Sequence, residues 1–241
     1  MLWVTSVMPT LTSFNLRGLT AKTALSVLRL ALQSHSDVTE RSYFMEGNIM
    51  GYKVPVGISN KHVHLSEQDL VVLFGAGYTL TPHKELVQPG QYAAHEQVDL
   101  IGPKGSFKKI RIIGPTRPQT QVEISQTDAR TLGVDAPVRE SGKLDGTPGI
   151  KLAGPKGEIE LGVGAIISLR HIHLSPAQAK EAGVADKDLV DVETYGKRPV
   201  VFKDVLIRSG DAHFREFHID TDEANAGGLG NGDEVEIIRK Q

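Results

Sequence analysis

From about residue 50 onward, apolar residues gather in short runs separated by glycine, proline and polar positions. Runs such as KKIRIIG, TQVEI, GEIELGV and DEVEII are rich in valine and isoleucine and are followed by turn-forming residues. Short runs of this kind are typical of strands in β-barrels and β-sandwiches. We therefore expect a mainly β protein over this part of the chain.

Two helical stretches interrupt the strand pattern. They are SEQDLVVLFG at 66–75 and SPAQAKEAG at 175–183, and each directly follows a His-x-His-Leu phrase. A serine at the first position can cap a helix, and Pro176 suits the first helical turn. The sequence thus predicts two strands that each carry a histidine pair and run into a capped helix.

The first 46 residues differ from the rest of the chain. They contain basic residues but no acidic residue before Asp37. Within LRGLTAKTALSVLRLALQ, leucines recur at helical spacing and predict an amphipathic helix. These leucines are Leu16, Leu19, Leu25, Leu28 and Leu32.

This extension has three alternative interpretations. Lys22 and Arg29 interrupt the apolar run, which disfavours a secretory signal. The basic, acid-poor composition is also that of organelle transit peptides. A helix that docks on its own protein stays open as the third alternative.

Composition limits the chemistry. The 241 residues are 39% apolar and suit one large domain or two small ones. The net charge of −2 implies no general affinity for polyanions, so we expect no nucleic-acid partner. No run of 18 uncharged apolar residues occurs, and we expect a soluble protein without a membrane span. Cysteine is absent, so any metal must use nitrogen and oxygen ligands and a nucleophile must be something other than a thiol.

The phrase KHVHLS at 61–66 returns as RHIHLS at 170–175. In an extended segment, residues two apart point to the same side, so each phrase directs two imidazoles at one spot. A strand presents nitrogen ligands to a metal in this way.

A second repeat supplies a third ligand to each pair. EISQTDARTLGV at 123–134 aligns without gaps with HIDTDEANAGGL at 218–229, which places Glu123 opposite His218. An internal duplication explains both repeats and predicts two similar small domains. Three protein ligands per ion leave positions open for water or substrate, as in catalytic zinc sites. The two predicted triplets are His62, His64 and Glu123, and His171, His173 and His218, whereas His35, His83, His95 and His213 have no such partners in the pattern.

Basic residues lie near these ligands in the sequence. Arg117 stands six residues before Glu123 on a loop rich in glycine and proline. Its guanidinium could hold a phosphate or carboxylate by two parallel hydrogen bonds, or it could be an ordinary surface arginine. LIGPKGSFKKIRI and LAGPKGEIEL predict two hairpin turns, and Lys104 and Arg111 could contact a polyphosphate or simply face solvent.

These motifs together resemble a known family. VPVGISNKHVHLS, VDLIGPKG, IIGPTRPQTQVEIS, RHIHLSP and FREFHIDTDEANA are similar to the PduL-type phosphate acyltransferases of bacterial microcompartments, from about Gly51 to the C-terminus. The resemblance implies an α+β fold, mainly β with short helices, in which two tandem β-barrels are capped by helices. It places a centre of two zinc or similar divalent ions at their junction. The implied domains are 60–169 and 47–59 with 170–241, preceded by the extension 1–46.

The resemblance also assigns roles to residues. The two triplets fall on the family's metal ligands, and Arg117 falls on its phosphate-binding, catalytic arginine. The positions associated with coenzyme A are Ile58, Ser59, Asn60, Lys104, Arg111 and Asn225.

The implied reaction exchanges a short acyl group, propanoyl or acetyl, between coenzyme A and inorganic phosphate. Direct attack by phosphate suits a chain without cysteine, although a carboxylate or hydroxyl acyl-enzyme stays open. A dinuclear zinc hydrolase and a non-catalytic metal-binding barrel are the alternatives. The hydrolase would need no phosphate, and the binding protein would need no arginine beside its metal.

The resemblance gives the extension 1–46 a role as well. Its helix would direct the enzyme to shell or core proteins and into the lumen of a microcompartment within the cytoplasm. The other implied partners are acyl-CoA, CoA and phosphate, with room for a homo-oligomer.

Overall fold

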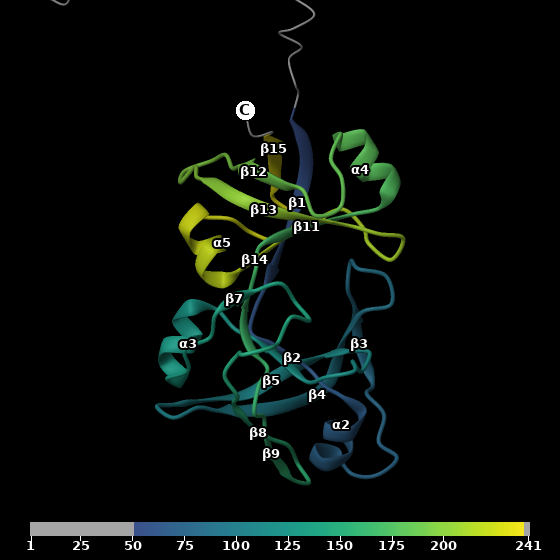
Figure 1. Ribbon diagram of the computed structural model, residues 1–241, viewed down its shortest axis with the longest axis vertical. Helices are drawn as coiled ribbons and strands as arrows, with labels where there is room; N and C mark the ends of the chain where they lie inside the picture. The colour runs from purple at the N-terminus through teal and green to yellow at the C-terminus, as the bar shows by residue number, and fades with distance from the viewer. Residues whose placement is uncertain (1–50, 239–241) are drawn as a thin grey trace, which may run out of the picture. The chain divides into compact units, whose positions relative to one another are not determined.

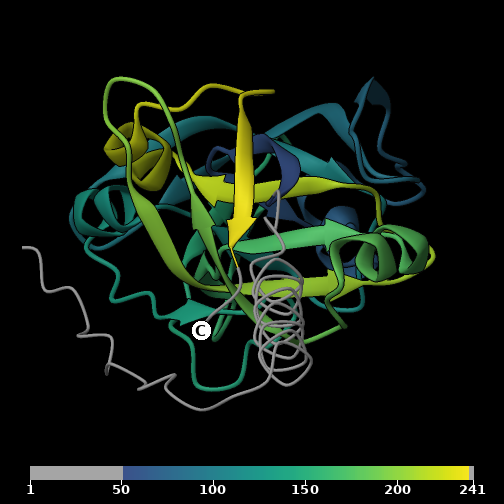
Figure 2. The same ribbon diagram turned by 90° about the horizontal axis from the view of Figure 1, so that it is seen from above.

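The computed structural model describes residues 51–238 (Figure 1, Figure 2). The predicted helix within 1–46 lies outside the described residues. Over residues 51–238 the chain is mainly β with four short helices, which confirms the predicted fold class. No helix in this range has the length and apolar character needed to cross a lipid bilayer.

Six strands close into a barrel in the order β1, β14, β11, β13, β12, β15 (upper part of Figure 1). The first strand joins five strands from the C-terminal part of the chain, because β1 pairs in parallel with β14 and antiparallel with β15. Fully buried Ile172, Ile207 and Phe217 belong to its core. The strands are β1 (Tyr52–Ser59), β11 (His171–Leu174), β12 (Leu189–Glu193), β13 (Val201–Ser209), β14 (Glu216–Asp220) and β15 (Glu234–Ile238).

The remaining nine strands form a second sheet in the order β7, β10, β6, β2, β5, β4, β8, β9, with β3 paired to β4. Strand pairing leaves this sheet open, although the Ala165 amide donates to the Pro148 carbonyl at 3.0 Å. Leu65, Ile112 and Leu152 are fully buried in its core. The strands are β2 (His62–His64), β3 (Pro82–Glu85), β4 (Tyr92–Ile101), β5 (Ser106–Gly114), β6 (Gln121–Glu123), β7 (Val138–Arg139), β8 (Lys151–Ala153), β9 (Glu158–Glu160) and β10 (Ala165–Ser168).

Each helix begins at a side-chain cap. The caps Ser66, Ser125, Ser175 and Asp220 all accept a hydrogen bond from the backbone amide three residues ahead. This satisfies one of the amides that a helix start leaves without a partner. The predicted capped helices after the two histidine strands are confirmed. The four helices are α2 (Glu67–Phe74), α3 (Gln126–Leu132), α4 (Pro176–Ala182) and α5 (Thr221–Gly227).

The two Gly-Pro-Lys-Gly segments form the predicted turns, and both dock on a helix end. Gly102 and Gly154 each donate to the carbonyl three residues ahead at 2.9 Å. The Lys104 amide donates to the last residue of α3, Leu132, at 3.0 Å. A Cβ at Gly102 would lie 2.3 Å from the Leu132 carbonyl oxygen, so this close approach requires glycine.

The internal duplication is visible in the strand pairing. His62 lies opposite Glu123 in the antiparallel pair β2 and β6, and His171 lies opposite His218 in β11 and β14. In both halves the histidine strand also pairs in parallel with a long strand, β5 or β13. Because the strands of the two halves pair in the same way, the ligand residues of the two triplets lie at matching positions in their sheets.

The two halves exchange one strand. β1 leads into the first histidine strand but belongs to the barrel that carries the second triplet. Conversely, β10 leads into the second histidine strand but pairs in parallel with β6, which carries Glu123. Each histidine strand therefore begins where the chain passes from one sheet to the other.

Candidate metal centre

The first triplet is assembled by two neighbouring strands. His62 and His64 project from β2, and their Nε2 atoms lie 3.2 Å apart. Glu123, on β6, brings Oε2 to 3.7 Å from His62 Nε2 and Oε1 to 3.8 Å from His64 Nε2. All three side chains are largely buried, so their ligand atoms converge away from bulk water.

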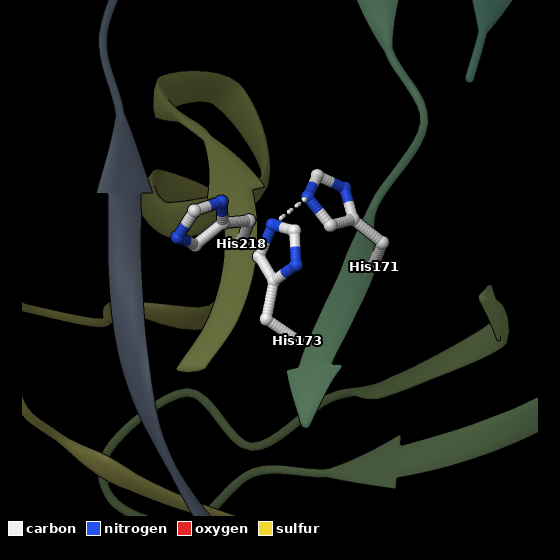
Figure 3. Close-up of side chains that lie close together, drawn as sticks. All are labelled: His171, His173 and His218. Carbon is white, nitrogen blue, oxygen red and sulfur yellow. Dashed lines mark hydrogen bonds between the residues drawn. The ribbon is translucent and has the colours of Figure 1, made fainter. Parts of the chain in front are cut away.

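The second triplet repeats this arrangement in the barrel (Figure 3). His171 and His173 on β11 bring their Nε2 atoms to 3.1 Å. The His218 ring, on β14, lies 5.0 Å from the His171 ring and 4.9 Å from the His173 ring, measured between centroids. Within residues 51–238, these two triplets are the groups whose ligand atoms converge closely enough to hold a metal ion.

Backbone carbonyls set the protonation of three of these imidazoles. His62 Nδ1 donates to Asn60 at 2.8 Å, His64 Nδ1 to Ile113 at 3.0 Å, and His171 Nδ1 to Leu169 at 2.7 Å. A carbonyl can only accept, so the proton sits on Nδ1 and the Nε2 lone pair points into the site. Lone pairs facing each other repel unless a cation lies between them, and the residues therefore fit a metal ion.

The electrostatics keep these ligands ready to bind a metal. Burial, together with the neighbouring His62 and Arg117, lowers the pKa of His64 well below its usual value. Burial and His218 lower the pKa of His171 to about 3. Burial alone would raise the pKa of Glu123, but the nearby histidines and Arg117 outweigh it and bring it to about 2. Neutral imidazoles and an ionised carboxylate are the forms that bind metals.

Each third ligand is supported by the residue two positions before it. His218 Nε2 lies 2.6 Å from Glu216 Oε2, which leaves Nδ1 for an ion. Glu216 also accepts from Gln88 Nε2 at 3.1 Å, and Gln88 comes from the loop between β3 and β4. In the first triplet, Gln121 donates to Glu123. Neither supporting residue was predicted from the sequence, although the place of both in the repeat could have revealed them.

The two sites differ beside their second histidine. His64 donates to the Ile113 carbonyl, and the carbonyl at the equivalent position is that of Arg208. That carbonyl accepts from His213 Nδ1 at 2.9 Å instead, and His173 Nδ1 is buried with no hydrogen-bond partner among residues 51–238. The His213 ring packs 4.4 Å from the His173 ring. His213 had no predicted role near the site, and the structure places it in contact with the candidate ligand His173.

Arg117 is tied to the first triplet through Ser141. Its Nη1 donates to Ser141 Oγ at 3.1 Å, and the Ser141 hydroxyl donates to Glu123 Oε1 at 3.1 Å. The Arg117 amide also donates to the Leu65 carbonyl, which fixes the loop at the end of the histidine strand. Arg117 is therefore held beside a metal ligand. Ser141 carried no sequence signal, because it lies in a loop with no counterpart in the repeat.

One cavity brings the two triplets together. Glu123 from the first triplet and His171 and His218 from the second line it, together with Ser59 and Asn60. Its volume of about 30 Å³ gives room for water-sized groups. The space suits small groups at a metal centre.

The residues associated with coenzyme A do not all meet in this cavity. Ile58 donates its amide to Asn231 Oδ1 at 2.7 Å, next to Ser59. Arg111 pairs with His62 across the strands, and its guanidinium is bound to the carbonyls of Ala94 and His95. Lys104 lies exposed on the turn against α3, and Asn225 is exposed on α5.

Comparisons with known proteins show the family of this chain. The family model described as phosphate propanoyltransferase matches residues 55–230. A phosphate propanoyltransferase from Thermotoga maritima is 56% identical over 184 residues, covering 76% of this chain and 88% of that protein. Proteins of the same name from Clostridioides difficile and Salmonella typhimurium are 49% and 51% identical, covering 78% and 74% of this chain and 90% and 85% of those proteins. The chain, with its paired His-x-His strands and matching third ligands, therefore belongs to the phosphate propanoyltransferase family.

Proposed function

We propose that this chain, as an acyltransferase of that family, exchanges a short acyl group between coenzyme A and inorganic phosphate. The observation that supports this most directly is the chain of contacts from Arg117 through Ser141 to Glu123. An anion-binding guanidinium is thereby fixed beside a triplet that fits a metal ion. A site that only bound a metal would need no such arginine.

Two zinc ions, or similar divalent ions, would be held by the two triplets. The ligands are imidazole nitrogens and one carboxylate, a set that zinc commonly takes, and three per ion leave a position open. When bound, the ions would supply Lewis-acid polarisation of the thioester carbonyl and of phosphate. Everything else in the proposed reaction is carried by the chain's own side chains.

Arg117 would hold phosphate by its planar fork and orient one oxygen toward the thioester carbonyl. Attack forms the carbon–oxygen bond of the acyl phosphate, and the carbon–sulfur bond then breaks to release the CoA thiolate. The guanidinium also offsets the negative charge that builds up beside it during attack. Ser141 positions Arg117 for this role, and direct attack needs no thiol, which this chain lacks.

Ile58, Ser59, Asn60, Lys104, Arg111 and Asn225 are the proposed contacts to coenzyme A. Ser59 and Asn60 suit the thioester end best, because they line the cavity with the metal ligands. For the extension 1–46, we propose a microcompartment-targeting helix that binds shell or core proteins.

A coenzyme A release assay tests the proposal. The full-length protein, after metal analysis, is given acetyl-CoA or propanoyl-CoA with and without phosphate. We expect thiol release that depends on phosphate and an equal amount of acyl phosphate, trapped with hydroxylamine. Release without phosphate would instead identify a dinuclear hydrolase, and no release with either substrate from metal-loaded protein would favour a binding role.

A further inference from the structure

We infer that Arg208 is a second arginine of the anion site and binds the phosphoryl group opposite Arg117. This inference rests on the proposed function and deepens it. It concerns the recognition of phosphate and of the acyl phosphate product, and it involves a residue for which the sequence patterns gave no role.

Strand register directs Arg208 toward the metal centre. It lies on β13, directly opposite His173 on the parallel strand β11. Residues paired across neighbouring strands project from the same face of the sheet, so Arg208 and His173 share a face. The Arg208 side chain is 24% exposed, which leaves it within reach of a ligand that enters from solvent.

One short segment holds both arginines. Ser141 binds the Arg117 guanidinium, and the residue before it, Glu140, places Oε1 3.9 Å from Arg208 Nε. Arg117 comes from the loop between β5 and β6 of the nine-stranded sheet, and Arg208 comes from β13 of the barrel. Adjacent residues of one loop therefore fix one guanidinium from each half of the molecule.

Glu140 in this segment is ionised and is held by ion pairs. Glu140 accepts hydrogen bonds from Lys143 and Lys187, which outweigh the effect of burial and lower its pKa to about 2. Lys187 belongs to the barrel half, so Glu140 joins the two halves next to the site. Glu140 stays ionised at neutral pH and can hold the Arg208 cation in place.

Two cations that lie close together repel each other, and an anion bound between them reduces this repulsion. Burial lowers the pKa of Arg117, Glu123 offsets part of this effect, and the charge of Arg208 lowers the pKa again, so Arg208 disfavours the Arg117 cation in the absence of a ligand. A phosphate dianion would relieve that repulsion and offers enough oxygens for two forks. An acyl phosphate retains the same phosphoryl oxygens, so both substrate and product fit.

The repeat indicates that this second arginine is not a by-product of the duplication. The equivalent of Arg208 in the first half is Ile113, because both lie one residue beyond the isoleucine that pairs with the middle of the histidine motif. Each half thus contributes one arginine from a different position. The matching position in the first half is apolar, so the fold itself does not require an arginine there.

The test compares Arg208→Gln with the wild-type full-length enzyme, loaded with metal. Binding of inorganic phosphate is measured by calorimetric titration, and Michaelis constants are measured for phosphate and acyl-CoA. We expect Arg208→Gln to weaken phosphate binding and raise its KM by roughly tenfold or more, as for loss of a charge-assisted contact. The KM for acyl-CoA should stay within about twofold of wild type, and Arg208→Lys should recover part of the loss, since a point charge lacks the fork.

Arg139→Gln is the matched control, because Arg139 lies on the same segment and its exposed side chain donates to its neighbour's carbonyl, away from the site. It should bind phosphate as the wild type does. If Arg208→Gln loses its metals or unfolds, Glu140→Gln takes its place: it keeps the Arg208 charge but releases its anchor, and should weaken phosphate binding severalfold. Unchanged phosphate binding in whichever of these variants is metal-loaded would overturn the inference.

A double variant separates this inference from the proposed function. If both arginines hold one ligand, the effects of Arg117→Gln and Arg208→Gln on phosphate binding should not add. Additive effects would place them in separate sites and overturn the inference. Failure of the proposed function is a different result, namely wild-type enzyme that binds phosphate but releases no CoA in response to it.

Discussion

At the scale of single residues, the site is built by giving each imidazole nitrogen a separate task. The Nδ1 atoms of His62, His64 and His171 are occupied by backbone carbonyls, so Nε2 faces the partner histidine. His218 reverses this arrangement, because Glu216 occupies its Nε2. The carbonyl or carboxylate behind these four rings fixes their orientation before any ion arrives, which lowers the entropy lost on binding.

His171→Ala should remove metal from the second triplet and abolish turnover. Two ligands cannot hold zinc as three do, and the lost ring is a buried one that contacts both other rings of its triplet. Metal analysis should give about one ion per chain in place of about two. His83→Ala is the control, because His83 is exposed on β3 outside both triplets, and it should keep full metal content. A variant lacking His171 with full metal content and activity would contradict the assignment.

Arg117→Ala should weaken phosphate use far more than metal binding. The change removes the guanidinium but leaves all three first-triplet ligands in place. We expect the KM for phosphate to rise roughly tenfold or more, with partial recovery in Arg117→Lys. Ser141→Ala should give a smaller rise, because it releases the guanidinium without removing it, and it also removes one hydrogen bond to Glu123. Steady-state kinetics in phosphate, with metal content measured on the same samples, would detect these effects, and unchanged phosphate kinetics in Arg117→Ala would move the anion site elsewhere.

At the scale of elements, equivalent ion pairs bind each ligand-bearing strand to the helix that follows the third ligand. Lys61, just before His62, lies 3.1 Å from Asp128 on α3, and Arg170, just before His171, donates to Glu223 on α5 at 2.8 Å. Each cation also lies over a phenylalanine of the neighbouring long strand, Lys61 over Phe107 at 4.8 Å and Arg170 over Phe202 at 5.7 Å. Duplication has preserved a complete supporting cluster, in addition to the ligands.

Lys61→Ala should destabilise the protein by about 1–2 kcal/mol, because it leaves the largely buried Asp128 carboxylate without its cation. Since α3 directly follows Glu123, metal affinity at the first triplet should fall more than at the second. Thermal unfolding and metal titration measure the two effects. Lys108→Ala is the matched control: its pair with Asp99 is exposed, and its loss should cost less than about 1 kcal/mol. Equal costs for both variants would mean that the Lys61 pair has no special role.

At the scale of the whole molecule, the sequence revealed those features that repeat or follow a period. The strand-rich class and the capped helices follow from local patterns, and the structure contains both. The alignment of Glu123 with His218 follows from the repeat, and strand pairing places each of them opposite the first histidine of its half. The strand exchange of β1 and β10 could not be predicted from periodicity. The alternation of apolar residues identifies a strand and its buried face, but it does not specify the sheet to which the strand belongs. Ser141 and Glu140 were missed because they lie in a loop with no repeat, and only folding brings them to the site.

Deletion of residues 1–46 should leave a folded, metal-loaded and active enzyme. These residues lie outside the described part, whereas Gly51–Gln241 forms a compact unit of its own. A longer deletion through residue 59 should fail, because it removes β1 and opens the barrel that carries the second triplet. Thermal unfolding, metal content and CoA release, compared between the two truncations, test both expectations.

The same segment, fused to a reporter, should carry it into microcompartments. Leu25→Glu or Leu28→Glu should stop this by placing a charge in the leucine stripe, whereas Ser26→Glu changes a position outside the stripe and should be tolerated. Fluorescence microscopy and purification of the compartments measure the outcome. If the protein lacking 1–46 unfolds or loses its metals, the extension is part of the catalytic fold, and a reporter that stays dispersed with the intact segment would refute targeting.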